Sequence, residues 1–152
     1  MMTFENTVHI SRPVEEVFRF VADFENVPRW NYYVLQVRQL AGDGPGVGAA
    51  YHQVRKSDEQ TYRVVEYQAN RSVTVRTTPD STPWFEMRFT FQPVEGGTRL
   101  VDAWKLKTGH NPLLEKLAAF RVKAAVAENL GKLKELLESG QTRLQDGRLV
   151  RL

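Results

Sequence analysis

Residues 84–94, WFEMRFTFQPV, constrain the fold more than any other stretch of the chain. Phe85, Met87, Phe89 and Phe91 alternate with polar or charged residues, and successive side chains of a strand point to opposite faces. An antiparallel sheet with one face on a core and the other in water has this pattern. The segment therefore predicts a strand with one apolar and one wet face.

Other segments between residues 34 and 107 predict neighbouring strands of the same antiparallel sheet. They are 34–40, 49–56, 61–69, 72–78 and 99–107, and residues 3–10 predict a further strand at the start of the chain. Glu95-Gly96-Gly97-Thr98 indicates a tight hairpin, and the glycine-rich residues 41–48 indicate a flexible loop. The sheet is thus expected to have about six or seven strands.

Two short helices are predicted after the first strand. Pro13 suits the first turn of a helix, and an apolar stripe follows at the spacing i, i+3, i+4 and i+7. The stripe consists of Val14, Val17, Phe18 and Val21. Asn26 is predicted to cap the second helix, ahead of Pro28 and Trp30.

Asp23 and Glu25 lie among aromatic residues in this region and raise the question of a catalytic acid pair. Residues two apart do not face each other on a helix, so the pairing is disfavoured. Asp23 falls at the end of the first helix, where we expect it to turn to solvent or to cap the following turn.

A long helix is predicted over residues 112–138, with Asn111 as its N-cap, Pro112 in its first turn and Gly140 as its end. Its apolar residues form two rows on different faces, which indicates a helix that crosses a curved surface. The rows are Leu113, Leu117, Phe120 and Ala124, and Val122, Val126, Leu133 and Leu137. We expect a single domain over 1–140, followed by a polar tail or short added element at 141–152.

Composition narrows the function classes. The chain has no cysteine, and its three histidines are not at metal-ligand spacing, so no metal site is predicted. The net charge of +3 comes from basic residues spread along the chain, which makes nucleic-acid binding an unfavoured interpretation. No apolar run is long enough for a membrane span, and no signal peptide is visible, so a cytoplasmic protein is expected. No motif indicates a cofactor.

Four stretches, in this order and spacing, resemble the START/Bet v1-like superfamily, also called SRPBCC or polyketide cyclase/dehydrase-like. They are TVHISRPVEEVFRFVADFENVPRW at 7–30, PGVGAAY at 45–51, GGTRLVDAWKL at 96–106 and AENLGKLKELLE at 127–138. The resemblance implies an α+β helix-grip fold, in which a curved antiparallel sheet wraps the long C-terminal helix around an apolar cavity. Members bind lipids, sterols, polyketides, quinones or plant hormones, and a minority catalyse cyclisation or dehydration.

Candidate cavity residues are mainly aromatic, because such residues supply wide apolar walls with a few polar groups. The predicted ligand-binding set is Trp30, Tyr51, Tyr62, Phe85, Met87, Phe89, Phe91, Trp104, Leu117, Phe120, Arg121, Ala124 and Ala125. Asp102, His52 and Arg121 are the predicted orienting groups. If Leu100 and Trp104 face inward, period 2 places Asp102 with them, whereas the opposite register leaves Asp102 in solvent.

Three functions remain open at this point. The leading hypothesis is binding, for transport, sequestration or sensing, of a hydrophobic or amphipathic small molecule by a monomer or homodimer. The first alternative is a cyclase or dehydratase that uses Asp102, His52 and Tyr62 in general acid–base catalysis. The second alternative is an interaction module for a protein or the ribosome.

Overall fold

Seven strands form one antiparallel sheet in the computed structural model, which describes residues 1–152. Their spatial order is β1-β7-β6-β5-β4-β3-β2, so β2 to β7 form a meander and β1 joins it beside β7. The strands are β1 (Met2–Ile10), β2 (Val34–Ala41), β3 (Ala50–Arg55), β4 (Glu59–Gln68), β5 (Ser72–Thr77), β6 (Trp84–Val94) and β7 (Gly97–Lys107). Register shifts in the β2–β3 and β4–β5 pairs are irregularities of the kind that bend a sheet. The predicted run of strands is confirmed.

Two short helices connect β1 to β2, namely α1 (Val14–Val21) and the 3₁₀-helix η1 (Phe24–Arg29). The predicted cap at Asn26 is wrong. Asp23 is the N-cap, because its extended backbone lets its carboxylate accept a hydrogen bond from the Glu25 amide at 3.2 Å. Asn26 lies inside η1, where its side chain donates to the Phe20 carbonyl at 3.0 Å.

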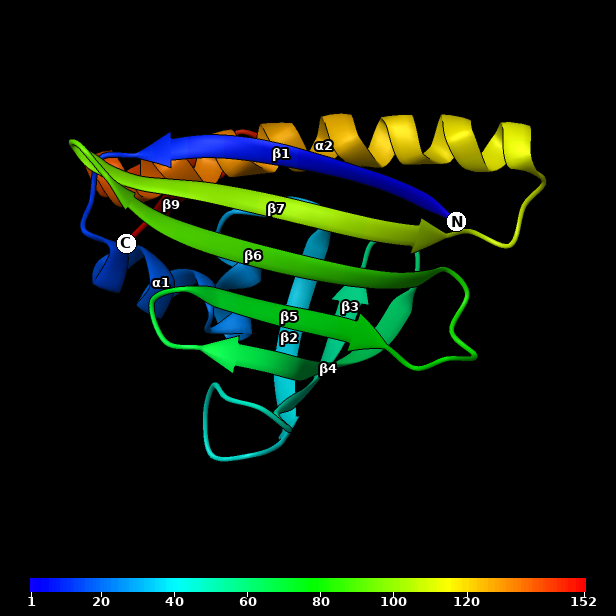
Figure 1. Cartoon of the computed structure of the whole chain (residues 1–152). Coiled ribbons are helices and arrows are strands. Elements are labelled where there is room, and N and C mark those ends of the chain that lie inside the picture. Colours follow the sequence, from blue (N-terminus) through cyan, green and yellow to red (C-terminus); the bar gives the residue numbers. More distant parts are fainter.

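The long helix α2 (Pro112–Ser139) runs along the β1 side of the sheet, while the sheet curls away from it toward β2 (Figure 1). Its ends are as predicted. The Asn111 side chain accepts a hydrogen bond from the Leu114 amide at 3.0 Å, and Gly140 ends the helix in the left-handed conformation. The helix-grip architecture is therefore confirmed.

Polar contacts fix the C-terminal part of α2 against the end of β1. The Arg12 guanidinium donates to the carbonyls of Leu137 at 2.9 Å and Glu138 at 2.8 Å. The Ser11 amide donates to the Glu138 carboxylate at 2.8 Å. The two Arg12 bonds satisfy carbonyls at the helix end that have no partner within the helix.

Only one of the two apolar rows predicted on α2 is directed into the protein. Val126, Leu133 and Leu137 are buried, and Glu115 and Ala119 continue their row toward the start of the helix. The other row lies on a different side of a helix with 3.6 residues per turn. Leu113, Leu117, Phe120 and Ala124 of that row are exposed.

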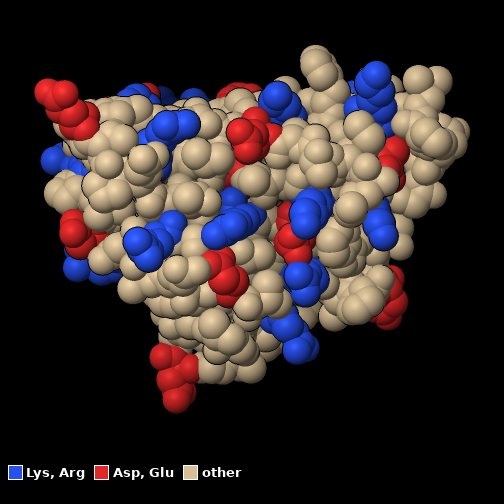
Figure 2. Space-filling model, in the orientation of Figure 1, with Lys and Arg blue, Asp and Glu red and all other residues tan.

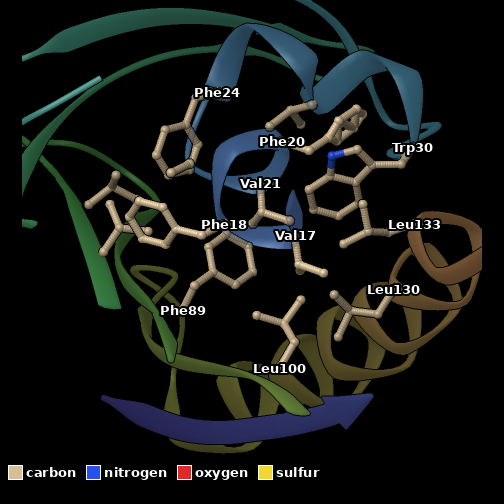
Figure 3. Packing of buried hydrophobic residues seen from close by; sticks show 14 of the residues in the cluster. Val17, Phe18, Phe20, Val21, Phe24, Trp30, Phe89, Leu100, Leu130 and Leu133 are labelled. Carbon is tan, nitrogen blue, oxygen red and sulfur yellow. The ribbon is translucent and has the colours of Figure 1, made fainter. Parts of the chain in front are cut away.

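The core lies where α1 and η1 meet the concave face of the sheet and the C-terminal half of α2. Figure 3 shows Val17 and Val21 of α1 directed toward Leu133 of α2 and Leu100 of β7. The ring of Phe18 meets that of Phe91 edge-on, with centroids 4.9 Å apart. This packing closes one end of the space between sheet and helix.

Residues after α2 form a small hairpin of β8 (Gln141–Arg143) and β9 (Leu149–Arg151). Leu144 between them is 3% exposed, and the Arg29 guanidinium donates to the Arg151 carbonyl at 2.8 Å. The side chain of Gln145 reaches Asn129 of α2. The segment is therefore folded against η1 and α2.

Gly97, at the start of β7, is required by a close approach of two backbones. A Cβ atom there would lie 2.1 Å from the Ile10 carbonyl oxygen, and its φ of 153° disfavours L side chains. We expect Gly97→Ala to lower the free energy of unfolding by on the order of 3 kcal/mol or more, measured by urea denaturation. Gly96→Ala is the matched control, since its φ is 78° with no atom within 4 Å, and it is expected to cost about 1 kcal/mol. Equal losses would contradict the steric explanation.

Candidate functional site

A small apolar chamber of about 60 Å³ lies between η1, the concave face of the sheet and α2. Its floor is formed by β4 to β7 and its sides by η1 and the middle of α2. The lining residues are Phe24, Val27, Trp30, Asn31, Gln53, Tyr62, Val75, Phe85, Met87, Phe89, Asp102, Trp104, Val126 and Asn129. We call this space the inner chamber.

A second, wider space of about 390 Å³ adjoins the inner chamber. The two spaces share Asn31, Gln53, Phe85, Trp104, Val126 and Asn129, so they lie side by side. This outer chamber opens between the turn after β3, with Arg55 to Ser57, and the Arg121 to Ala125 segment of α2. The site therefore has a deep apolar chamber and a wider outer chamber beside it.

Aromatic rings form a connected wall through the inner chamber. Tyr62 contacts Phe24 with ring centroids 5.8 Å apart and Phe85 at 6.0 Å. Phe85 contacts Trp104 at 5.1 Å. Because these rings come from η1, β4, β6 and β7, the curvature of the sheet and the position of η1 set the shape of the wall.

Asp102 lies inside the apolar chamber. Leu100, Asp102 and Leu106 of β7 are all buried, so the register that directs Asp102 inward is the observed one. Burial raises the pKa of the Asp102 carboxyl from 3.8 to about 7, and the nearby Trp104 indole opposes that rise only in part. The Trp104 indole lies close enough to lower the Asp102 pKa as a weak donor, but no hydrogen bond of ordinary geometry joins them, so Asp102 Oδ1 and Trp104 Nε1 have no well-formed partner. Two buried polar atoms thus remain unsatisfied at one place in the cavity.

A row of polar side chains leads from the inner chamber to the outer one. The Tyr62 hydroxyl donates to the side-chain Oε1 of Gln53 at 3.2 Å, and the side-chain Nε2 of Gln53 donates to Oε1 of Gln60 at 3.5 Å. Burial raises the pKa of Tyr62 well above its ordinary value, so the hydroxyl stays protonated and keeps this donor role. The Gln60 amide nitrogen is buried without a partner.

The mouth of the cavity is basic. Arg55 is neutralised by Asp58, which it contacts with two hydrogen bonds of 2.7 Å. Lys56 lies over the ring of Tyr32 at 3.4 Å, and Arg121 has no carboxylate within ion-pair distance. Two cations therefore line the outer chamber without an anionic partner.

Eight of the thirteen residues predicted to bind the ligand line one chamber or both. They are Trp30, Tyr62, Phe85, Met87, Phe89 and Trp104 in the inner chamber, and Arg121 and Ala125, with Phe85 and Trp104 again, in the outer one. Tyr51 and Phe91 are buried in the core but line neither chamber, and Leu117, Phe120 and Ala124 lie on the exposed side of α2. The last three are exposed because α2 turns a different row, with Ala119 and Val126, toward the sheet.

His52 does not reach the cavity. Tyr51 and Gln53 of β3 are directed inward, so the alternation of the strand directs His52 outward. Its ring lies 3.6 Å from the Glu59 carboxylate and 3.5 Å from the Thr61 hydroxyl. The predicted cavity role for His52 is corrected for this reason.

The polar lining residues Gln53, Gln60 and Asn129 were missed. Strand alternation from Tyr51 and Tyr62 could have found the two glutamines, since residues two apart share a face. Asn129 lies in the buried row of Val126 and Leu133. A polar side chain within a buried row is unusual, which marks it as a candidate site residue. The lining residues from η1 and from the turn after β3 follow only from the tertiary structure.

Charge on the outer face of the sheet is mixed. Figure 2 shows basic and acidic side chains interspersed over the view of Figure 1. Glu86 contacts both Arg76 and Lys105, and Glu66 contacts Arg88 at 3.7 Å. No cluster of three or more His, Cys, Asp or Glu could hold a metal ion, and no helix is both long and apolar enough to span a membrane.

A curved antiparallel sheet that grips a long C-terminal helix around an internal cavity defines a Bet v1-like helix-grip domain. The sequence profile of the family described as polyketide cyclase/dehydrase and lipid transport matches residues 1–138. The chain therefore belongs to that family. A search of curated protein sequences gives no significant match.

Solved structures share the fold at low sequence identity. TTHA0849 from Thermus thermophilus is 19% identical with a TM-score of 0.76, over 91% of this chain and 98% of that one. Ara h 8.0201 is 13% identical with a TM-score of 0.70, over 91% and 98%. The Aha1 dimer from Colwellia psychrerythraea is 14% identical with a TM-score of 0.68, over 91% and 97%. At these identities the likeness concerns the fold.

Proposed function

We propose that this protein binds an apolar or amphipathic small molecule in the two-chambered cavity. The observation that carries the proposal is the pair of unpartnered polar atoms, Asp102 Oδ1 and Trp104 Nε1, in a chamber walled by aromatic rings. Buried polar groups in proteins are almost always hydrogen-bonded, so a ligand group that satisfies both atoms would be favoured there. The lipid-transport part of the family description supports the same function.

The chemistry of the deep end favours a neutral hydroxyl or carbonyl group on the ligand. A hydroxyl accepts a hydrogen bond from the Trp104 indole and donates one to the Asp102 carboxylate. A carbonyl accepts from Trp104 and from protonated Asp102, which is substantially populated near neutrality because the pKa is about 7. An anionic group would be disfavoured there by desolvation and by ionised Asp102.

The charge at the mouth favours a negative group at the outer end of an amphipathic ligand. Arg121 and Lys56 line the outer chamber without ion pairs, so a carboxylate or another anionic group would be attracted there. The proposed ligand is thus a molecule with an apolar body, a hydroxyl or carbonyl at its inner end and, in the amphipathic case, a negative group at its outer end.

Binding is favoured over turnover by the arrangement of the titratable groups. The acid–base alternative needs two such groups in one pocket, and His52 lies outside the cavity. The Tyr62 hydroxyl is already used as the donor to Gln53. Asp102 then has no second titratable side chain beside it to serve as its acid–base partner. Its position in the cavity wall suits a hydrogen bond that orients a ligand.

A thermal-shift screen with fatty acids, sterols, quinones and aromatic polyketides tests this function. A ligand at a hundred times its dissociation constant stabilises the folded state by about 2.7 kcal/mol. For a domain of this size that corresponds to a rise in Tm of roughly 5–10 °C. We expect at least one class to produce such a rise, and no rise with any class would contradict the proposal.

A further inference from the structure

A stripe of four large apolar side chains lies exposed on the N-terminal half of α2. The exposed fractions are 78% for Leu113, 48% for Leu114, 47% for Leu117 and 71% for Phe120. Scattered exposed apolar residues are ordinary on protein surfaces, but a contiguous group on one helix marks an interaction site. The cavity does not account for this stripe, because none of the four residues lines either chamber.

Basic residues flank the stripe on both sides. At 3.6 residues per turn, Lys116 and Lys123 lie along one margin of the row from Leu113 to Phe120, and Arg121 lies on the other margin. No carboxylate is within ion-pair distance of these three cations. The helix therefore combines an apolar stripe with positively charged margins.

Acidic charge is nearly absent from the sequence around the stripe. Residues 105–123 contain Lys105, Lys107, Lys116, Arg121 and Lys123 but only one acid, Glu115. Glu115 is 8% exposed, and its carboxylate contacts the Met1 ammonium at 2.9 Å and accepts from the Thr108 amide at 3.1 Å. Within residues 105–123, therefore, no unpaired exposed acid accompanies the stripe.

We propose that the N-terminal half of α2 docks this protein onto an anionic lipid bilayer. The helix would lie in the plane of the membrane interface, with Leu113, Leu117 and Phe120 among the upper acyl chains and the flanking cations at the phosphates. In Figure 1 the start of α2 extends past the start of β1 and the end of β7, so this part of the helix is not covered by the sheet. The protein would bind at the membrane surface without spanning the bilayer.

The position of the stripe links the membrane to the cavity. Arg121, Val122 and Ala125 line the outer chamber and follow directly after Phe120. Docking through the stripe would bring the mouth close to the lipid surface, where an apolar ligand is most concentrated. The docking goes beyond the proposed function and does not depend on it, since an empty protein presents the same stripe.

Charge argues against a second copy of this chain as the occupant. Two copies packed stripe to stripe would bring the same Lys116, Arg121 and Lys123 cations close together in a desolvated interface, and like charges there are strongly unfavourable. An anionic bilayer supplies opposite charge to all three side chains and an apolar layer beneath them. The bilayer therefore matches both properties of the stripe.

Vesicle co-sedimentation of the full chain tests the proposal. We expect binding to vesicles of phosphatidylcholine with about 30% phosphatidylglycerol, an anionic content that gives the surface a negative potential, and much weaker binding to phosphatidylcholine alone. Leu113→Ser/Phe120→Ser is expected to reduce partitioning by at least about tenfold, because it removes the apolar contact. Lys116→Glu/Lys123→Glu and raised salt are expected to reduce it by a similar factor.

The matched control is Leu35→Ser/Leu40→Ser on β2, where the two side chains are 57% and 49% exposed. This variant is expected to sediment with vesicles as the wild type does. Circular dichroism confirms that each variant is folded, and retention of the thermal-shift response in Leu113→Ser/Phe120→Ser shows that ligand binding is separate from docking.

Equal binding to neutral vesicles, or no binding to either, would overturn the proposal. So would a stripe variant that changes only the oligomeric mass in analytical ultracentrifugation, which would assign the stripe to a second copy.

Discussion

Replacing Asp102 by Asn is expected to raise the free energy of unfolding at pH 8 by on the order of 4 kcal/mol, with little change near pH 4. The amide keeps the shape of the carboxylic acid but carries no charge into the inner chamber. The wild-type carboxylate is 2% exposed and has no cation beside it to offset its desolvation. The expected gain is therefore large for a single substitution in a cavity wall.

The sign follows from the direction of the pKa change. The pKa of Asp102 is about 7 in the folded protein against 3.8 as its ordinary value, so between these two pH values the folded state holds a proton that the unfolded state has released. Stability therefore falls as the pH rises through this interval, and Asp102 causes no further loss above about pH 7. The difference in pKa corresponds to roughly 4 kcal/mol.

Urea denaturation of both proteins at several pH values between 4 and 8 measures this difference. Taking the difference between variant and wild type removes the contribution of other groups, such as Glu66 and Glu86, whose pKa values are lowered. Asp43→Asn, in the exposed loop after β2, is expected to leave the pH dependence unchanged. A wild type that gains or keeps stability from pH 5 to pH 7 relative to Asp102→Asn would contradict the buried, unpaired carboxyl.

The second large effect concerns the mouth of the cavity. Ala125 lines the outer chamber from α2, so a tryptophan at this position would fill the passage between the helix and the turn after β3. We expect Ala125→Trp to weaken ligand binding by at least about a hundredfold, because a ligand would have to displace a large, well-packed side chain. Chain stability should change little, since the passage is open space and α2 tolerates the residue.

Ala124→Trp is the matched control for this substitution. Ala124 is the neighbouring residue on the same helix, it is exposed, and it lines neither chamber. Titration of both variants with a ligand found in the thermal-shift screen measures the effect, with Trp30 and Trp104 of the inner chamber as intrinsic fluorophores. Equal affinity of the two variants would show that the ligand does not enter through this mouth.

Local patterns in the sequence predicted the elements well. The alternation over residues 84–94 predicts β6 with the same bounds, and the Asn111 cap and Gly140 end predict the limits of α2 to within one residue. These features depend on neighbouring residues only, because a cap or a strand face is specified by residues a few positions apart. The spatial arrangement of the elements was predicted from the resemblance to the superfamily.

Tertiary context decided what the local patterns left open. The row with Leu113 and Phe120 has the hydrophobicity of a buried face, yet the helix turns Glu115 and Ala119 inward instead. Glu115 is held there by the Met1 ammonium and the Thr108 amide, contacts that no helical periodicity reveals. The sequence prediction placed His52 in the cavity because histidine is a common acid–base group. Strand alternation with an inward Tyr51 directs His52 outward.

Native mass spectrometry of gently purified protein tests the central claim most directly. We expect a fraction of the protein to carry a discrete additional mass from a bound small molecule, which is lost on activation and absent from Ala125→Trp. The released molecule should be largely apolar with a hydroxyl or carbonyl group. A wild type that carries no bound molecule and acquires none when mixed with extracted cellular lipids would contradict a ligand-binding cavity.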